Sequence, residues 1–98
     1  MLGVGWKRVN ATPNDYVYIY EEGYGCSCEI RYWTEAYAIY TTVNKPAEGG
    51  VLSPLLTTTG FASYLEVYCE ANSYKIKVKS STSAGNVAVY YRHIRLGG

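Results

Sequence analysis

The chain is poor in the side chains that most enzymes use. Among its 98 residues there is one histidine, His93, and one aspartate, Asp15. Serines are plentiful, but none lies in the Gly-x-Ser-x-Gly sequence of a nucleophile elbow. No glycine-rich phosphate loop leads from a strand into a helix. We therefore expect a protein that is not an enzyme, with no catalytic residues and no cofactor.

Long apolar runs and an excess of charge are also lacking. No apolar stretch approaches the roughly 20 residues of a membrane-spanning helix, and residues 1–5 lack the charged start of a secretory signal. The formal net charge is +1, whereas nucleic-acid-binding domains usually carry a basic excess. The sequence thus predicts neither a membrane partner nor a nucleic-acid partner.

Cysteines are few and odd in number. Cys26 and Cys28 lie two apart on a predicted strand, so they point the same way and are badly placed to bond with each other. One of them could bridge to Cys69, but three buried reduced thiols are the favoured interpretation. Together with His93 these are zinc-binding residue types, yet Cys-x-Cys on a strand is unlike the spacing of structural zinc sites, and we expect no metal.

What the chain has is alternation, most clearly over residues 63–80. Apolar residues at every second position are interrupted at Asn72–Ser73 and then resume. This period is typical of half-buried strands, and it predicts a hairpin with a two-residue turn. The predicted register pairs Ala71 with Tyr74, Cys69 with Ile76 and Val67 with Val78 on the apolar face. On the outer face it pairs Glu70 with Lys75, Tyr68 with Lys77 and Glu66 with Lys79.

The other predicted strands are short and separated by turn signals. They are expected at residues 6–9, 16–22, 26–33, 36–43 and 87–96, with a short edge strand at Thr57–Thr59. In the strand at 36–43 we expect Tyr37, Ile39, Thr41 and Val43 on the apolar side. In the last strand we expect a change of phase near Arg92–His93, by a bulge or by burial of both faces. The fold class is an all-β antiparallel sandwich, jelly-roll or immunoglobulin-like, of about seven or eight strands in one domain over residues 1–98.

Tyrosine dominates the aromatic residues, with 12 tyrosines against one phenylalanine and two tryptophans. Tyrosine suits sites where the ring is covered and the hydroxyl is wet, which is typical of protein interfaces and of sugar-binding faces. The alternative is that β-sheets simply favour tyrosine.

One group of these aromatics is expected to form a partner-binding surface. Val17 and Ile19 should face the core, so the tyrosines between them should face outward. The strand at 26–33 should pair with this one through a hairpin loop of about five residues. The predicted surface then consists of Tyr16, Tyr18, Tyr20, Arg31 and Trp33, a composition enriched at interface hot spots. The alternative is an inverted sheet, with the tyrosines packed inward.

The stretch Ser83–Ile94 resembles the closing strand of small β-sandwich modules in tailed-phage virions. In those modules a Ser/Thr/Gly-rich loop leads into an apolar strand with paired aromatics, here Tyr90 and Tyr91. The resemblance implies a virion structural protein of a bacteriophage, most specifically a capsid decoration or cement protein that binds neighbouring capsid subunits and self-associates. It implies synthesis in the host cytoplasm without a signal peptide. The alternative is a glycan-binding module, such as a lectin or a tail-fibre tip, that uses exposed tyrosine and tryptophan.

Overall fold

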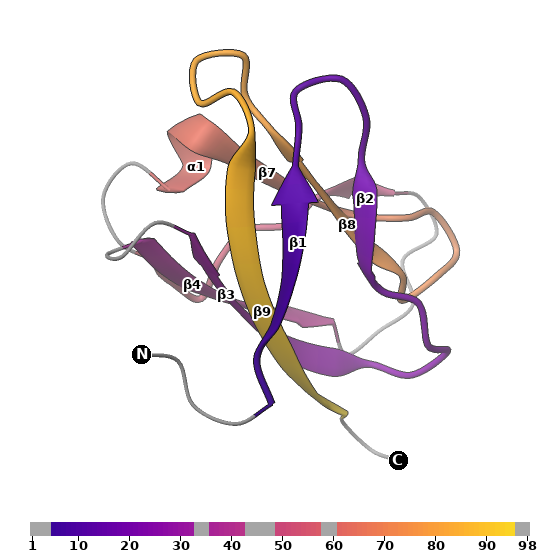
Figure 1. The fold of residues 1–98 in the computed structure, drawn as a ribbon. Helices are drawn as coiled ribbons and strands as arrows, with labels where there is room; N and C mark the ends of the chain where they lie inside the picture. The colour runs from indigo at the N-terminus through magenta and orange to yellow at the C-terminus, as the bar shows by residue number, and fades with distance from the viewer. Residues whose placement is uncertain (1–4, 33–35, 43–48, 58–60, 96–98) are drawn as a thin grey trace.

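The computed structural model describes residues 5–32, 36–42, 49–57 and 61–95, and they form an antiparallel β-sandwich. The five-stranded sheet has the order β1-β9-β3-β4-β6, and the four-stranded sheet has the order β2-β8-β7-β5 (Figure 1). The strands are β1 (Lys7–Ala11), β2 (Val17–Tyr20), β3 (Cys26–Tyr32), β4 (Ala36–Thr42), β5 (Gly50–Val51), β6 (Leu56–Thr57), β7 (Leu65–Cys69), β8 (Ile76–Ser80) and β9 (Val87–Arg95). A single helical turn, α1 (Phe61–Tyr64), precedes β7. The predicted fold class is therefore confirmed.

The hairpin of β7 and β8 has the predicted register. Cys69 pairs with Ile76 and Val67 with Val78, and all four side chains are buried. Regular pairing stops at Cys69, and one further backbone bond runs from the Glu70 N–H to the Lys75 carbonyl at 2.9 Å. The connection is therefore a four-residue loop, Ala71–Tyr74, rather than the predicted two-residue turn. Asn72 occupies the left-handed region at φ 54°, which asparagine tolerates better than most residues.

The centre of the core is β3, as its alternation predicts. Cys26, Cys28, Ile30 and Tyr32 are all fully buried, and the residues between them are half-buried. The three cysteines are free thiols inside the sandwich. Burial raises the pKa of Cys26 to about 11 and raises the pKa of Cys28 further, so both thiols stay protonated.

The predicted inward face of β4 is wrong. Ala36, Ala38, Tyr40 and Thr42 are buried, while Tyr37, Ile39 and Thr41 are half-buried on the outer side; Val43 lies outside the described residues. The pairing with β3 explains the choice, because Ala38 lies opposite Ile30 and Ala36 opposite Tyr32. Small side chains on β4 make room for the large ones on β3, so packing volume decides which side faces the core.

The predicted pairing of β2 with β3 is also wrong. β2 pairs with β8 in the four-stranded sheet, and β3 pairs with β4 and β9 in the other sheet. The five residues between β2 and β3 therefore carry the chain from one layer of the sandwich to the other. Gly23 and Gly25 mark a turn there, but a loop of that length serves a hairpin equally well, so the local sequence does not reveal the crossing.

A β-bulge near the end of β2 overturns the predicted orientation of Tyr20. Tyr18 pairs with Lys77 and Tyr20 with Ile76, so β2 advances by two residues where β8 advances by one. The alternation changes phase there, and both Ile19 and Tyr20 face the core. Tyr20 is only 3% exposed, and its hydroxyl donates to the Tyr24 carbonyl at 2.7 Å.

The last strand does not change phase. β9 lies between β1 and β3, with an unbroken register from Val89 opposite Tyr32 to Arg95 opposite Cys26 (Figure 1). Val87 and Val89 are buried, whereas Ile94 is 60% exposed on the outer side. The predicted bulge is thus wrong; one isoleucine near the end of the strand faces solvent instead. The predicted edge strand is present as β6, which pairs with β4, while Thr58 and Thr59 lie outside the described residues.

Candidate binding surfaces

The structure divides the predicted binding residues among three places. Tyr16 and Tyr18 lie on the outer face of the four-stranded sheet, and Arg31 lies on the outer face of the five-stranded sheet. Tyr20 belongs to the core, and Trp33 lies outside the described residues. The single predicted patch is therefore replaced by two outer faces on opposite sides of the sandwich.

We call the outer side of the four-stranded sheet the tyrosine face. It consists of Tyr16, Tyr18, Val51, Glu66, Tyr68, Glu70, Lys77 and Lys79. One cross-strand row spans all four strands, because Tyr18 pairs with Lys77, Lys77 with Tyr68, and Tyr68 with Val51. Tyr18 is 39% exposed and Val51 is 62% exposed, so both ends of the row are open to solvent.

Lysines lie among the aromatic rings of the tyrosine face. The Lys77 ammonium is 4.9 Å from the centre of the Tyr16 ring, 5.3 Å from that of Tyr68 and 5.8 Å from that of Tyr18. Lys79 lies 4.8 Å from the Tyr16 ring. These distances fall within the range of cation–π attraction. The rings are therefore held in place by cations of the same chain.

The glutamates of this face bind tyrosine hydroxyls. Tyr16 donates to Glu66, and Tyr18 donates to Glu70. Among the described residues neither carboxylate forms an ion pair with a lysine, although Glu66 is in register with Lys79 as predicted. Burial, followed by the contact with Glu66, raises the pKa of Tyr16 to about 12, so its hydroxyl remains a donor.

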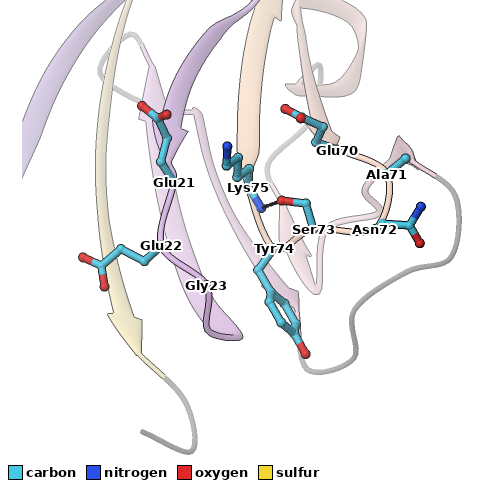
Figure 2. Close-up of a pocket in the computed structure, with 9 residues that line it drawn as sticks. All are labelled: Glu21, Glu22, Gly23, Glu70, Ala71, Asn72, Ser73, Tyr74 and Lys75. Atoms are coloured by element: carbon cyan, nitrogen blue, oxygen red, sulfur yellow. Dashed lines mark hydrogen bonds between the residues drawn. The ribbon is translucent and has the colours of Figure 1, made fainter.

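A depression adjoins one end of the tyrosine face. It has a volume of about 440 Å³ and is lined by residues 21–23 after β2 and 70–75 between β7 and β8. Figure 2 shows Glu21 and Glu22 on one side and Glu70 on the other, with Lys75 between them. The backbone N–H of Lys75 donates to the Ser73 hydroxyl at 2.8 Å, which holds the loop. Glu70 connects the depression to Tyr18 on the face.

We call the outer side of the five-stranded sheet the arginine face. Its charged and aromatic side chains are Trp6, Arg8, Glu29, Arg31, Tyr37, Tyr90 and Arg92. One row alternates two residue types across four strands, because Arg8 pairs with Tyr90, Tyr90 with Arg31, and Arg31 with Tyr37. The Arg31 guanidinium lies 5.8 Å from the centre of the Tyr37 ring.

Beside that row lies a linked group built around Glu29. The Arg92 Nε lies 2.7 Å from a Glu29 carboxylate oxygen, and the Tyr37 hydroxyl donates to the other oxygen. The same guanidinium lies 4.8 Å from the centre of the Trp6 ring. The hydrogen bond from Arg92, with that from Tyr37, holds the pKa of Glu29 below its usual range. Glu29 is thus ionised and held from two sides at neutral pH.

His93, the one histidine of the chain, packs inside the sandwich. His93 stacks edge-on against the buried Tyr20 at 4.8 Å, and burial lowers its pKa. In the part of the chain that the structure describes, no three histidine, cysteine or acidic side chains come together as a metal site. Over the same residues, no helix is long and apolar enough to cross a membrane.

Sequence reasoning missed most of the arginine face. The sequence predicts Trp6 and Arg8 on a short first strand, and nothing local shows that this strand lies beside the last one. Tyr90 and Arg92 do alternate with Val89 and Tyr91, and this signal was present in the sequence. An unbroken period of two through residue 94 would have identified that outer set.

Comparison of the chain with protein-family models, with curated proteins and with solved structures finds no match in any of the three.

Proposed function

We propose that this chain is a non-enzymatic structural protein that binds other protein subunits through the tyrosine face. The observation that carries the proposal is the row from Tyr18 to Val51, which crosses the whole four-stranded sheet and is open at both ends. Aromatic rings fixed in position bury large areas at little cost in side-chain entropy, which is what interface hot spots require.

The resemblance of Ser83–Ile94 to virion β-sandwich modules supports a more specific assignment. We place the protein in a bacteriophage virion as a capsid decoration protein, which joins neighbouring shell subunits and self-associates. The two outer faces on opposite sides of a thin sandwich suit a protein that bridges two neighbours.

The test is the self-association of the natural chain and of the Tyr18→Ser variant, measured by sedimentation equilibrium. We expect the natural chain to form a symmetric oligomer. Removal of the Tyr18 ring should raise the dissociation constant of that oligomer about tenfold. Tyr24→Ser is the matched control, because Tyr24 is a comparably exposed tyrosine, at 47%, in the loop between β2 and β3. A strictly monomeric protein that also fails to bind empty tailed-phage capsids would contradict the proposal.

A glycan-binding module is the second candidate, and the depression favours it. The exposed Tyr18 ring adjoins a hollow that carries three carboxylates, and sugars are commonly held by an aromatic ring beside hydrogen-bonding carboxylates. Against it, the Tyr16 and Tyr68 rings are tilted by 48° and lysines lie over them, so the face is no planar platform. A glycan array and titration with millimolar sugars decide the matter: binding that Tyr18→Ser abolishes would favour this candidate.

A further inference from the structure

The tyrosine face separates its acidic and basic side chains by strand. Three rows cross β7 and β8, with Glu66 beside Lys79, Tyr68 beside Lys77, and Glu70 beside Lys75 at the border with the depression. Every acid of these rows lies on the β7 side, and every base lies on the β8 side. A surface divided in this way is complementary to a copy of itself after half a turn.

The contacts within the chain leave this division in place. One oxygen of Glu66 accepts from Tyr16, and one oxygen of Glu70 accepts from Tyr18. Lys77 and Lys79 lie over tyrosine rings. A carboxylate accepts at both oxygens and an ammonium has three donors. The face therefore keeps its internal contacts while it presents acid along one strand and base along the next.

A two-fold axis parallel to the strands, between β7 and β8, uses this complementarity. Half a turn about that axis places β7 of one copy over β8 of the other, so each row meets its own copy in reverse order. Glu66 then stands over Lys79 of the second copy, Tyr68 over Lys77, and Glu70 over Lys75. All three rows bring unlike groups together.

The same rotation joins the two exposed ends of the long row. β2 and β5 flank β8 and β7 at equal distances, one strand out on each side, so Tyr18 comes over Val51 of the second copy. Both side chains are exposed in the single chain. Sheets that pack face to face lie about 10 Å apart, which lets side chains from the two sides interdigitate. The contact buries a ring against an aliphatic side chain.

An axis that runs across the strands gives the opposite result. It would place Glu66 over Glu70, Lys79 over Lys75, and Lys77 over its own copy. Like charges brought together in an interface suppress association. The charge pattern therefore selects the axis parallel to the strands.

We infer that the partner of the tyrosine face is a second copy of this chain, in a two-fold dimer with β7 of each copy over β8 of the other. The inference rests on the proposed function, since it names the partner of the same surface. Charge pairs enclosed in an interface are screened by salt much less than exposed ones. They fix the orientation of the two copies, while the buried rings supply the affinity.

The first experiment cross-links two variants of the full chain, Tyr18→Cys and Val51→Cys, with a short bis-maleimide linker. The mixture should give about fivefold more linked dimer than either variant alone, because copies of the same position lie on opposite sides of the axis. The natural chain is the control, since its own cysteines are buried.

The second experiment reverses charges and measures the dissociation constant by sedimentation equilibrium. Glu66→Lys puts a positive charge over Lys79 of the second copy and should raise the constant about tenfold. Adding Lys79→Glu to the same chain restores an unlike pair in both halves of the dimer, and should return the constant to within about threefold. The matched control is Glu22→Lys, the same charge change at an exposed residue away from the face, with an expected effect below about twofold.

The outcomes separate this inference from the proposed function. If the natural chain self-associates but the mixture gives no more linked dimer than the separate variants, the inference is overturned and the proposed function stands. Stronger association of Glu66→Lys would indicate the axis across the strands and would overturn the inference as well. A natural chain that stays monomeric also overturns it, and capsid binding then decides on the proposed function.

Discussion

The two outer faces of the sandwich are built from the same three kinds of side chain, and yet these side chains contact one another in different ways. Each face has tyrosines, basic residues and glutamate arranged in cross-strand rows. On the tyrosine face the cations are lysines that lie over the rings, and the glutamates bind tyrosine hydroxyls. On the arginine face one glutamate is held at the centre by Arg92 and Tyr37.

The difference teaches that the cross-strand neighbours of each side chain, rather than the composition of the face, decide which groups the face presents. Lys77 stands in register between Tyr18 and Tyr68, so its charge is directed at rings of its own chain. Arg31 stands between Tyr90 and Tyr37, in a row that contains a second arginine and no acid. The first arrangement favours burial against another surface, whereas the second holds a carboxylate of the same chain, Glu29.

The largest expected effect concerns the tyrosine that the bulge moves from the face into the core. Tyr20→Ala should lower the free energy of unfolding by about 3–5 kcal/mol, because it removes a buried ring and leaves a cavity. Tyr18→Ser, two residues away on the same strand, should cost less than about 1 kcal/mol. Urea unfolding of both variants measures the contrast, and equal losses would mean that the membership of the tyrosine face is wrong.

A smaller effect separates the glutamates of the two faces. Glu29→Gln should cost about 1 kcal/mol, since it weakens the contacts with both Arg92 and Tyr37. Glu66→Gln should cost about half as much, because Glu66 accepts from Tyr16 alone among the contacts of the described residues. Thermal or urea unfolding at neutral pH provides the comparison. A larger loss for Glu66→Gln would reverse our ranking of the two carboxylates.

Removal of one lysine should have a still smaller effect on stability. Lys77→Gln abolishes the cation–π attraction to three rings, and we expect a loss of about 0.5 kcal/mol at this exposed site. Lys77→Arg is the control that retains a cation. Tyrosine fluorescence should change for Lys77→Gln, because the environment of the rings changes. No change in either stability or fluorescence would show that the lysine does not order the face.

The smallest effect at neutral pH lies in the interior between the faces. Burial, with the nearby charge of Lys7 as the second cause and opposed by Glu22, holds the pKa of His93 below its ordinary 6.5. Protonation therefore favours the unfolded chain. The stability that depends on neutral His93 is complete above pH 6.5 and is lost as the pH falls below that value.

The measurement is the free energy of unfolding of the natural chain and of His93→Gln across this range. We expect His93→Gln to flatten the decline just below pH 6.5. The contribution of Glu29 acts in the same direction but at lower pH, below its ordinary 4.5, because its folded pKa is also depressed. Parallel profiles for the two proteins would contradict the assignment to His93.

The parts of the fold that follow from the sequence are those with one apolar side and one polar side. The β7–β8 hairpin has lysines and glutamates on its outer positions, so only one register buries its apolar set. β3 is similar, with Glu29 and Arg31 facing outward. In both elements a local pattern contains enough information to give the orientation.

The rest depends on contacts between distant segments. β4 is apolar on both sides, so its orientation depends on whether Ile30 and Tyr32 leave room for large or small side chains. The pairing of β2 with β8 joins segments almost 60 residues apart, and the bulge that buries Tyr20 exists only within that pairing. The residues of the predicted binding patch are divided for the same reason, since Tyr18 and Arg31 lie on different sheets.

The most direct test of the account is the salt dependence of self-association, measured by sedimentation equilibrium of the natural chain over a series of sodium chloride concentrations. If the tyrosine face associates by burial of its rings, and its lysines and glutamates are already paired within the chain, the dissociation constant should change less than about twofold across the series. Self-association that weakens steeply with added salt would contradict the claim that the charges of the tyrosine face are satisfied within the chain.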